Sequence, residues 1–239
     1  MKQDSCGLDP VATQLLNEAR DWRLLALLFE RPREGWWAEV SDLARSCRDT
    51  ELAAAAAAAH GAAEGEYHAI FGPGRLVSPR EAGHRKTADP SKLLSEIHAY
   101  YEAFHFAPST EETIDHVAVE AGFLGWMKLK EAYARAGGDG ESAEVTEAAA
   151  QRFLLRHLAT MAEPIQTGLG AAGIDYLDRA AHSLVARTGP RPKDVEGDWV
   201  PEGLAEDDSP FACGIHSAGC AARSGEALSE FEDPLDGVL

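Results

Sequence analysis

The sequence predicts an all-α fold, and the residue composition is the first observation behind that prediction. The 239 residues include 42 alanines and 24 leucines but only 10 valines and 6 isoleucines. Alanine and leucine favour helices, whereas β-branched residues favour strands. Apolar residues also recur at three- and four-residue spacing, and no stretch alternates apolar and polar residues as a half-buried strand does. We therefore expect one multi-helix bundle.

The first helix has a clear start and a clear end. Asp9 is a suitable N-cap and Pro10 fits the first helical position. The helix ends near Arg31-Pro32, because a residue that precedes proline avoids helical geometry. A second helix is expected over residues 36–47. A third is expected over residues 51–59, which include seven consecutive alanines.

The Gly72-Pro73-Gly74 sequence breaks the helical pattern and predicts a loop over residues 75–88. Long loops between helices often carry function. Asp89-Pro90 then starts a helix rich in aromatic residues, and Pro108 ends it.

The longest helix is expected over residues 109–136. Ser109 followed three residues later by Glu112 forms a capping box, and Gly137-Gly138 stops the helix. At about 1.5 Å per residue it would be roughly 40 Å long. A further helix is expected over residues 141–161, and Pro164 just beyond it should end or kink the helix. The last helix is expected over residues 174–187.

Charge divides the chain into two predicted regions, a helical domain at 1–190 and an acidic, Pro/Gly-rich tail at 191–239. The net charge is −18. The tail holds 12 acidic and 3 basic residues, a net of −9, and its composition predicts partial disorder. A polyanion repels phosphate backbones, so nucleic-acid binding is not expected. The N-terminal residues lack a secretory apolar region and no run of 18 apolar residues occurs, so we expect a cytoplasmic protein without membrane insertion.

Four side chains that begin the longest predicted helix form the most informative cluster. At helical spacing they share one face, which would be acidic with an embedded imidazole. An ordinary capping glutamate with a solvated face explains the same spacing. The cluster consists of Glu112, Asp115, His116 and Glu120.

Two metal sites can be considered from the sequence. Cys213, His216 and Cys220 place three soft ligands within eight residues of the tail, but no fourth ligand is evident, so free thiols remain the simpler interpretation. Glu81-x-x-His84 is a single copy of a motif that dimetal bundles need twice. We therefore predict no metal site. The nucleotide-binding glycine loops and the nucleophile elbow of hydrolases are also absent from the sequence.

Three stretches resemble the TorD/DmsD/NarJ family of redox-enzyme maturation chaperones. The first is Tyr67–Pro73, followed by Ser78-Pro79-Arg80-Glu81; it is similar to the family's Tyr-x-x-Leu-Phe-x-Gly segment and proline-containing loop. The second is Glu112–Glu120, which matches the Glu-x-Pro-Asp-His-x-x-x-Glu signature except that Ile114 replaces proline. The third is Phe153–Leu158, similar to a Phe-x-x-x-His-Leu segment.

This resemblance implies a helical, non-enzymatic chaperone without catalytic residues or a cofactor. Its expected partner is the apo form of a molybdenum-containing oxidoreductase catalytic subunit of the DMSO-reductase family. The chaperone would bind the twin-arginine signal peptide of that subunit and assist cofactor insertion before export. The expected client-binding residues are Glu112, Asp115, His116, Glu120, Tyr67, Ile70, Phe71, Pro79 and Glu81. In this hypothesis an apolar groove determines affinity, and the carboxylates of Glu112, Asp115 and Glu120 meet the arginines.

Two alternative functions remain open at this point. One is a metal- or redox-responsive protein that uses Cys213, His216 and Cys220. The other is an assembly subunit without chaperone action.

Overall fold

The computed structural model describes residues 9–72, 74–85 and 89–190, and these residues form a helical bundle. The all-α prediction is confirmed. The helices are α1 (Pro10–Phe29), α2 (Trp36–Ala44), α3 (Thr50–Ala58), α4 (Glu64–Phe71), α5 (Pro90–Ala103), α6 (Val117–Ala136), α7 (Gly140–Phe153), α8 (Ala159–Ala172) and α9 (Asp175–Thr188). The predicted tail lies outside the described residues, so the division into two domains remains a prediction.

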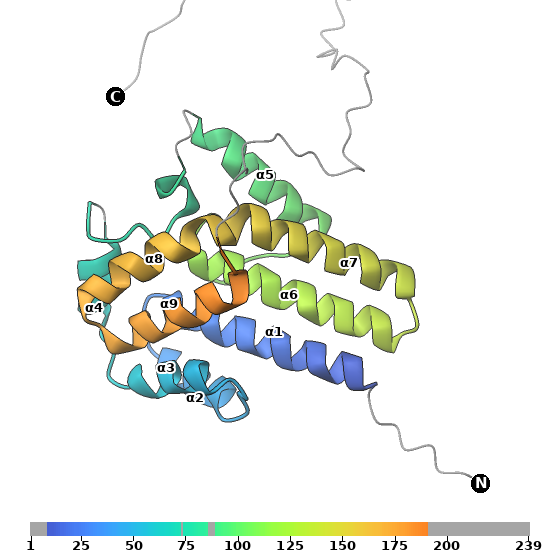
Figure 1. Ribbon diagram of the computed structural model, residues 1–239, viewed down its shortest axis with the longest axis horizontal. Coiled ribbons are helices and arrows are strands. Elements are labelled where there is room, and N and C mark those ends of the chain that lie inside the picture. Colours follow the sequence, from blue (N-terminus) through green and yellow to red (C-terminus); the bar gives the residue numbers. More distant parts are fainter. Residues whose placement is uncertain (1–8, 73, 86–88, 191–239) are drawn as a thin grey trace, which may run out of the picture. The chain divides into compact units, whose positions relative to one another are not determined.

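Helices α1 and α6 lie side by side through the centre of the bundle (Figure 1). Every residue of Leu24–Glu30 is buried, so the C-terminal part of α1 is surrounded by other elements on all sides. Gly125 allows α6 to approach α1 closely, because an added Cβ would lie 3.0 Å from the Ala19 carbonyl oxygen. No helix in the described part of the chain is both long and apolar enough to cross a membrane.

Helix α6 begins eight residues later than the sequence predicted. His116 is its N-cap, and the His116 side chain accepts a hydrogen bond from the Ala118 backbone N–H. Residues 113–116 stay outside the helix because their backbone pairs with another segment: Glu81 N–H donates to the Asp115 carbonyl and Val117 N–H donates to the Pro79 carbonyl, both at 2.8 Å. The helix has 20 residues, which makes it about 30 Å long rather than 40 Å.

A π turn interrupts the helix that was predicted over residues 141–161. Helix α7 ends at Phe153, the π turn spans Leu154–Leu158, and α8 continues through Pro164 to Ala172. Of the two effects predicted for Pro164, ending the helix is wrong, because α8 continues through it. A π turn shifts the direction of the side chains that follow it, and here it contains the buried His157.

Candidate functional site

Residues 77–85, which we call the strap, cross from the end of α4 to the polar interior of the bundle. Its backbone forms an isolated antiparallel bridge between Arg80 and His116. Its Val77 side chain fills the space beside Gly168 of α8, where an added Cβ would lie only 2.6 Å from Val77 Cγ2. The strap is therefore fixed against both α8 and the segment that precedes α6.

An open hollow of about 590 Å³ lies between α4, the strap and residues 111–116. We call it the Tyr67 hollow. The side chains of Tyr67, Phe71 and Val77 are buried beneath it. Charged side chains of both signs surround this apolar floor, together with the imidazole of His68. The charged residues are Arg31, Arg75, Arg80, Glu111 and Glu112.

A chain of hydrogen bonds connects the buried His116 to the edge of the Tyr67 hollow. The Ala118 N–H donates to His116 Nδ1 at 3.1 Å, so the ring proton resides on Nε2. Nε2–H then donates to the Tyr67 hydroxyl at 3.0 Å, and that hydroxyl donates to Glu112 Oε1 at 3.2 Å. Burial lowers the pKa of His116 to about 4, so the imidazole is neutral near pH 7. This series of hydrogen bonds holds the Glu112 side chain in place at the rim of the Tyr67 hollow.

Asp115 is fully buried, and Arg80 of the strap is its partner. Arg80 Nε lies 2.9 Å from Asp115 Oδ1 and 3.2 Å from Oδ2, and the Ala82 N–H donates to the same carboxylate at 3.3 Å. Asp115 therefore fixes the strap in place. The expectation that Asp115 contacts a client arginine is wrong for this conformation, because the carboxylate has no exposed surface.

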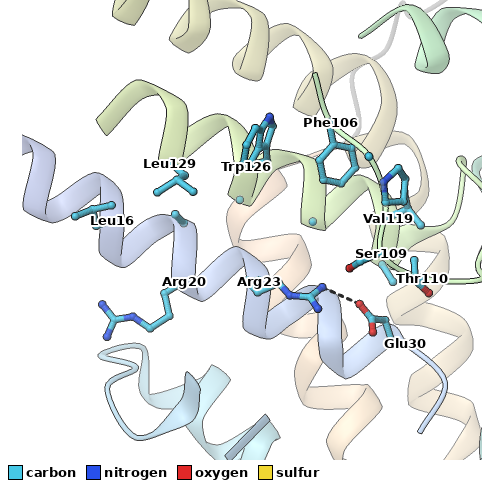
Figure 2. Close-up of a pocket in the computed structure, with 16 residues that line it drawn as sticks. Leu16, Arg20, Arg23, Glu30, Phe106, Ser109, Thr110, Val119, Trp126 and Leu129 are labelled. Carbon is cyan, nitrogen blue, oxygen red and sulfur yellow. Dashed lines mark hydrogen bonds and ion pairs between the residues drawn. The ribbon is translucent and has the colours of Figure 1, made fainter. Parts of the chain in front are cut away.

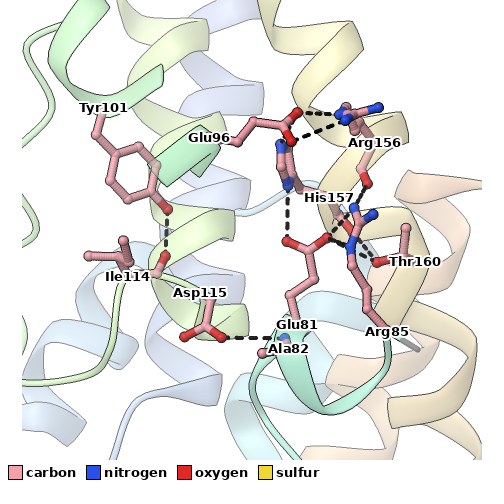
Figure 3. A network of polar contacts seen from close by, with 10 residues as sticks. All are labelled: Glu81, Ala82, Arg85, Glu96, Tyr101, Ile114, Asp115, Arg156, His157 and Thr160. Atoms are coloured by element: carbon pink, nitrogen blue, oxygen red, sulfur yellow. Dashed lines mark hydrogen bonds and ion pairs between the residues drawn. The ribbon is translucent and has the colours of Figure 1, made fainter. Parts of the chain in front are cut away.

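Glu81 has a similar structural role deeper in the bundle (Figure 3). Its carboxylate accepts hydrogen bonds from His157 Nδ1 at 3.0 Å and Thr160 Oγ1 at 3.3 Å, and it forms an ion pair with Arg85. Burial alone would lower the pKa of His157, but the carboxylates of Glu81 and Glu96 outweigh it and raise that pKa. Glu81 is therefore a buried anchor of the strap, and its carboxylate has no exposed surface in this structure.

Glu120 is also fully buried, on the first turn of α6. Both of its carboxyl oxygens lack a hydrogen-bond partner among the described residues. Burial, followed by the nearby carboxylates of Glu81 and Asp115, raises the pKa of Glu120 well above its usual range. A carboxyl group of this kind holds its proton and cannot attract an arginine.

The predicted site residues therefore fall into two groups. Tyr67, Phe71, Pro79, Glu112 and His116 come together at the Tyr67 hollow. The other four do not line it: Asp115, Glu81 and Glu120 are buried polar groups, and Ile70 is a buried apolar residue. The predicted helix face was wrong because only Glu120 of its four members lies in a helix.

Sequence reasoning missed several residues that define the site. Arg80 and His157 lie within two of the stretches that carried the family resemblance, yet neither was selected as a site residue. Arg31 lines the hollow and forms ion pairs with Glu64 and Glu111. These pairs join residues 33 and 80 positions apart, and no sequence spacing signals a contact over such separations.

The tail cluster of Cys213, His216 and Cys220 lies outside the described residues. Within 9–72, 74–85 and 89–190, no group of three or more His, Cys, Asp or Glu side chains could hold a metal ion. The Tyr67 hollow is an open surface with an apolar floor and a charged rim.

A family model now identifies the chain. The model of the nitrate reductase delta subunit family matches residues 31–165, a range that includes the strap, the Tyr67 hollow and the buried polar groups. The chain belongs to this family. The resemblance to redox-enzyme maturation chaperones of the TorD/DmsD/NarJ type is thereby confirmed.

Two proteins with sequences similar to this chain are named as assembly chaperones. The selenate reductase assembly chaperone protein of Thauera selenatis is 31% identical over 163 residues, which cover 66% of this chain and 79% of that protein. The chlorate reductase assembly chaperone protein of Ideonella dechloratans is 33% identical over 118 residues, which cover 47% of this chain and 60% of that protein. No solved structure matches the chain. These names indicate assembly chaperones rather than catalysts.

Proposed function

We propose that this protein is a cytoplasmic assembly chaperone for a molybdenum-containing oxidoreductase. It binds the apo catalytic subunit through the twin-arginine signal peptide and holds it until the cofactor is inserted, before export. Membership of the delta subunit family and the names of the two relatives support the chaperone role. The observation that carries the proposal is the open Tyr67 hollow, a preformed surface built from residues of the family-matched region.

The geometry of the Tyr67 hollow suits a peptide that has both apolar and charged parts. Its floor is apolar and its rim offers Glu111 and Glu112, whose side chains are 89% and 23% exposed. Burying about 500 Å² of apolar surface contributes roughly 12 kcal/mol before ordering costs, whereas each exposed ion pair contributes about 0–1 kcal/mol. After those costs, binding in the micromolar range or tighter is expected, with apolar contact as the larger contribution.

Buried ion pairs give the hollow a fixed shape. Asp115 and Glu81 hold the strap at two points, through Arg80 and through His157. A surface that is already ordered loses less conformational freedom when a peptide binds. The buried residues of the family signature therefore support the binding surface from below instead of touching the client.

Co-purification from the native cell tests the proposal. The full chain should retain the catalytic subunit of a molybdenum oxidoreductase that lacks its cofactor. Thr113 is exposed and lines the hollow, so Thr113→Trp should obstruct the surface and reduce recovery of the subunit. Thr13→Trp is the matched control, because Thr13 is exposed on α1 and does not line the Tyr67 hollow. Equal recovery with both variants would contradict the proposed site.

A further inference from the structure

A second hollow, of about 380 Å³, lies between α1, α6 and the segment after α5 (Figure 2). We call it the α1–α6 groove. Its floor contains the small residues Ala19, Gly122 and Gly125. Apolar side chains form most of its walls, namely Leu16, Phe106, Trp126 and Leu129. Arg20 and Arg23 of α1 also line it, and Arg23 pairs with Glu30 at 2.8 Å.

The groove is preformed in the same sense as the Tyr67 hollow. The Trp126 indole N–H donates to the Phe104 carbonyl at 2.9 Å, which ties this wall to the end of α5. Phe106 is held by ring contact with Tyr101, at a centroid distance of 5.0 Å. An apolar groove with fixed aromatic walls is suited to the apolar side chains of a polypeptide segment.

The two ends of the groove differ in polarity. Leu16 and Leu129 lie at one end, and Leu129 is 42% exposed. Ser109, Thr110 and Glu30 lie at the opposite end (Figure 2).

The polar end of the groove is also the boundary of the Tyr67 hollow. Glu30 and Thr110 line the groove, whereas their chain neighbours Arg31 and Glu111 line the hollow. Residues 30–31 and 109–111, which we call the ridge, therefore contribute to both surfaces.

Arg31 marks a place on this ridge that accepts a guanidinium group. Its Nη1 lies 3.2 Å from Glu64 Oε1 and its Nη2 lies 2.8 Å from Glu111 Oε2. All three side chains are exposed, at 38%, 55% and 89%. Ion pairs at such exposure are weak, so a competing guanidinium could replace Arg31 at little cost.

We propose that the two surfaces hold one client segment, with its apolar part in the α1–α6 groove and its basic end at the ridge. There a client arginine takes the position of Arg31 between Glu64 and Glu111. The inference rests on the proposed function and specifies which part of the client binds to which surface. The stretch from Val119 to Leu129 rises about 15 Å along α6, which accommodates about five extended residues.

Binding of a synthetic peptide to the full chain tests the apolar part of this inference. The probe has two adjacent arginines followed by an apolar run, and calorimetry gives its affinity. Leu129→Asp should weaken binding about tenfold, because a half-exposed leucine loses its contact with the apolar run. Leu155→Asp is the matched control, since Leu155 is 41% exposed and lies outside the groove. A second peptide, with its apolar run replaced by serine, should bind both variants equally weakly.

Arg31→Gln tests the basic end. Removal of the internal guanidinium should tighten binding of the arginine peptide about threefold, because Glu64 and Glu111 become available, and should have a smaller effect on a dilysine peptide. Arg45→Gln is the control, because Arg45 pairs with Asp42 on α2, away from both surfaces.

Three results would overturn either the placement of the client segment on the two surfaces or the proposed function. Equal affinity of the Leu129→Asp and Leu155→Asp variants overturns the groove assignment and leaves the proposed function standing. Unchanged or weaker binding with Arg31→Gln overturns the arginine position. Failure of the unmodified chain to bind the arginine peptide contradicts the proposed function itself.

Discussion

Burial of His116 should make the stability of the protein depend on pH below neutrality. Burial lowers the pKa of His116 to about 4, against 6.5 for an exposed histidine, and the charges of Asp115 and Arg80 change that value less than burial does. Between these two pH values the unfolded chain takes up a proton that the folded chain does not. Stability is therefore fully present above pH 6.5 and declines as the pH falls towards 4.

The size of the effect follows from the pKa difference. A shift from 6.5 to about 4 corresponds to about 3 kcal/mol once the pH is below both values, and to about 2 to 3 kcal/mol at pH 4.5. This is a large part of the stability of a typical domain.

The variant His116→Asn isolates this contribution. Asparagine is a good N-cap and can still accept the hydrogen bond from the Ala118 N–H, but it does not titrate. Urea unfolding followed by circular dichroism should show that the unmodified protein loses about 2 to 3 kcal/mol more than the variant between about pH 7 and about pH 4.5. Carboxylates titrate in both proteins, so their effects cancel in the difference. Two parallel stability curves would refute the reasoning.

Three further predictions concern the buried polar groups and the strap. Glu81→Gln should lower the unfolding free energy by about 3 kcal/mol, because His157 and Arg85 lose their carboxylate partner; a loss below about 1 kcal/mol in urea unfolding would contradict the anchoring role. Glu120→Gln should instead stabilise the protein at pH 7. The raised pKa of Glu120 means that folding at this pH requires the ionised carboxyl of the unfolded chain to take up a proton, and this cost decreases near pH 4.5, so the gain in stability is smaller there. A destabilisation at pH 7 as large as that of Glu81→Gln would be inconsistent with a protonated Glu120. Gly168→Ala should lower the melting temperature through a clash with Val77, and Val77→Ala should restore part of the loss; no recovery in the double variant would mean that the strap does not pack there.

The helices were predictable because their signals are local. Asp89 caps α5 through its side chain, and Asp9-Pro10 marks the start of α1, as their sequence patterns predict. The start of α6 was not predictable in the same way. The Ser109–Glu112 capping box competes with backbone pairing between residues 115–117 and the strap, and that pairing depends on residues more than 30 positions away.

The candidate site was partly predictable from residue type and family resemblance. Spacing and resemblance both indicated Asp115, His116 and Glu120, the resemblance alone indicated Glu81, and the structure brings these four residues together around the strap. Their exposure could not be read from the sequence. A carboxylate near a helix start is usually solvated, and only a distant partner such as Arg80 allows Asp115 to be buried.

The contrast between Glu112 and Asp115 shows what the fold adds. Both belong to the same family-like signature, three residues apart. Glu112 keeps 23% of its side-chain surface at the rim of the Tyr67 hollow, whereas Asp115 keeps none. Of these two carboxylates, Glu112 is the one that reaches the surface in this structure.

Hydrogen–deuterium exchange of the full chain, with and without the arginine-containing apolar peptide, tests the central claim most directly. The account predicts slower exchange in α4, in the strap and over residues 109–129, because these segments surround the Tyr67 hollow and the α1–α6 groove. Tight binding of the peptide that leaves exchange unchanged in all three segments would contradict it.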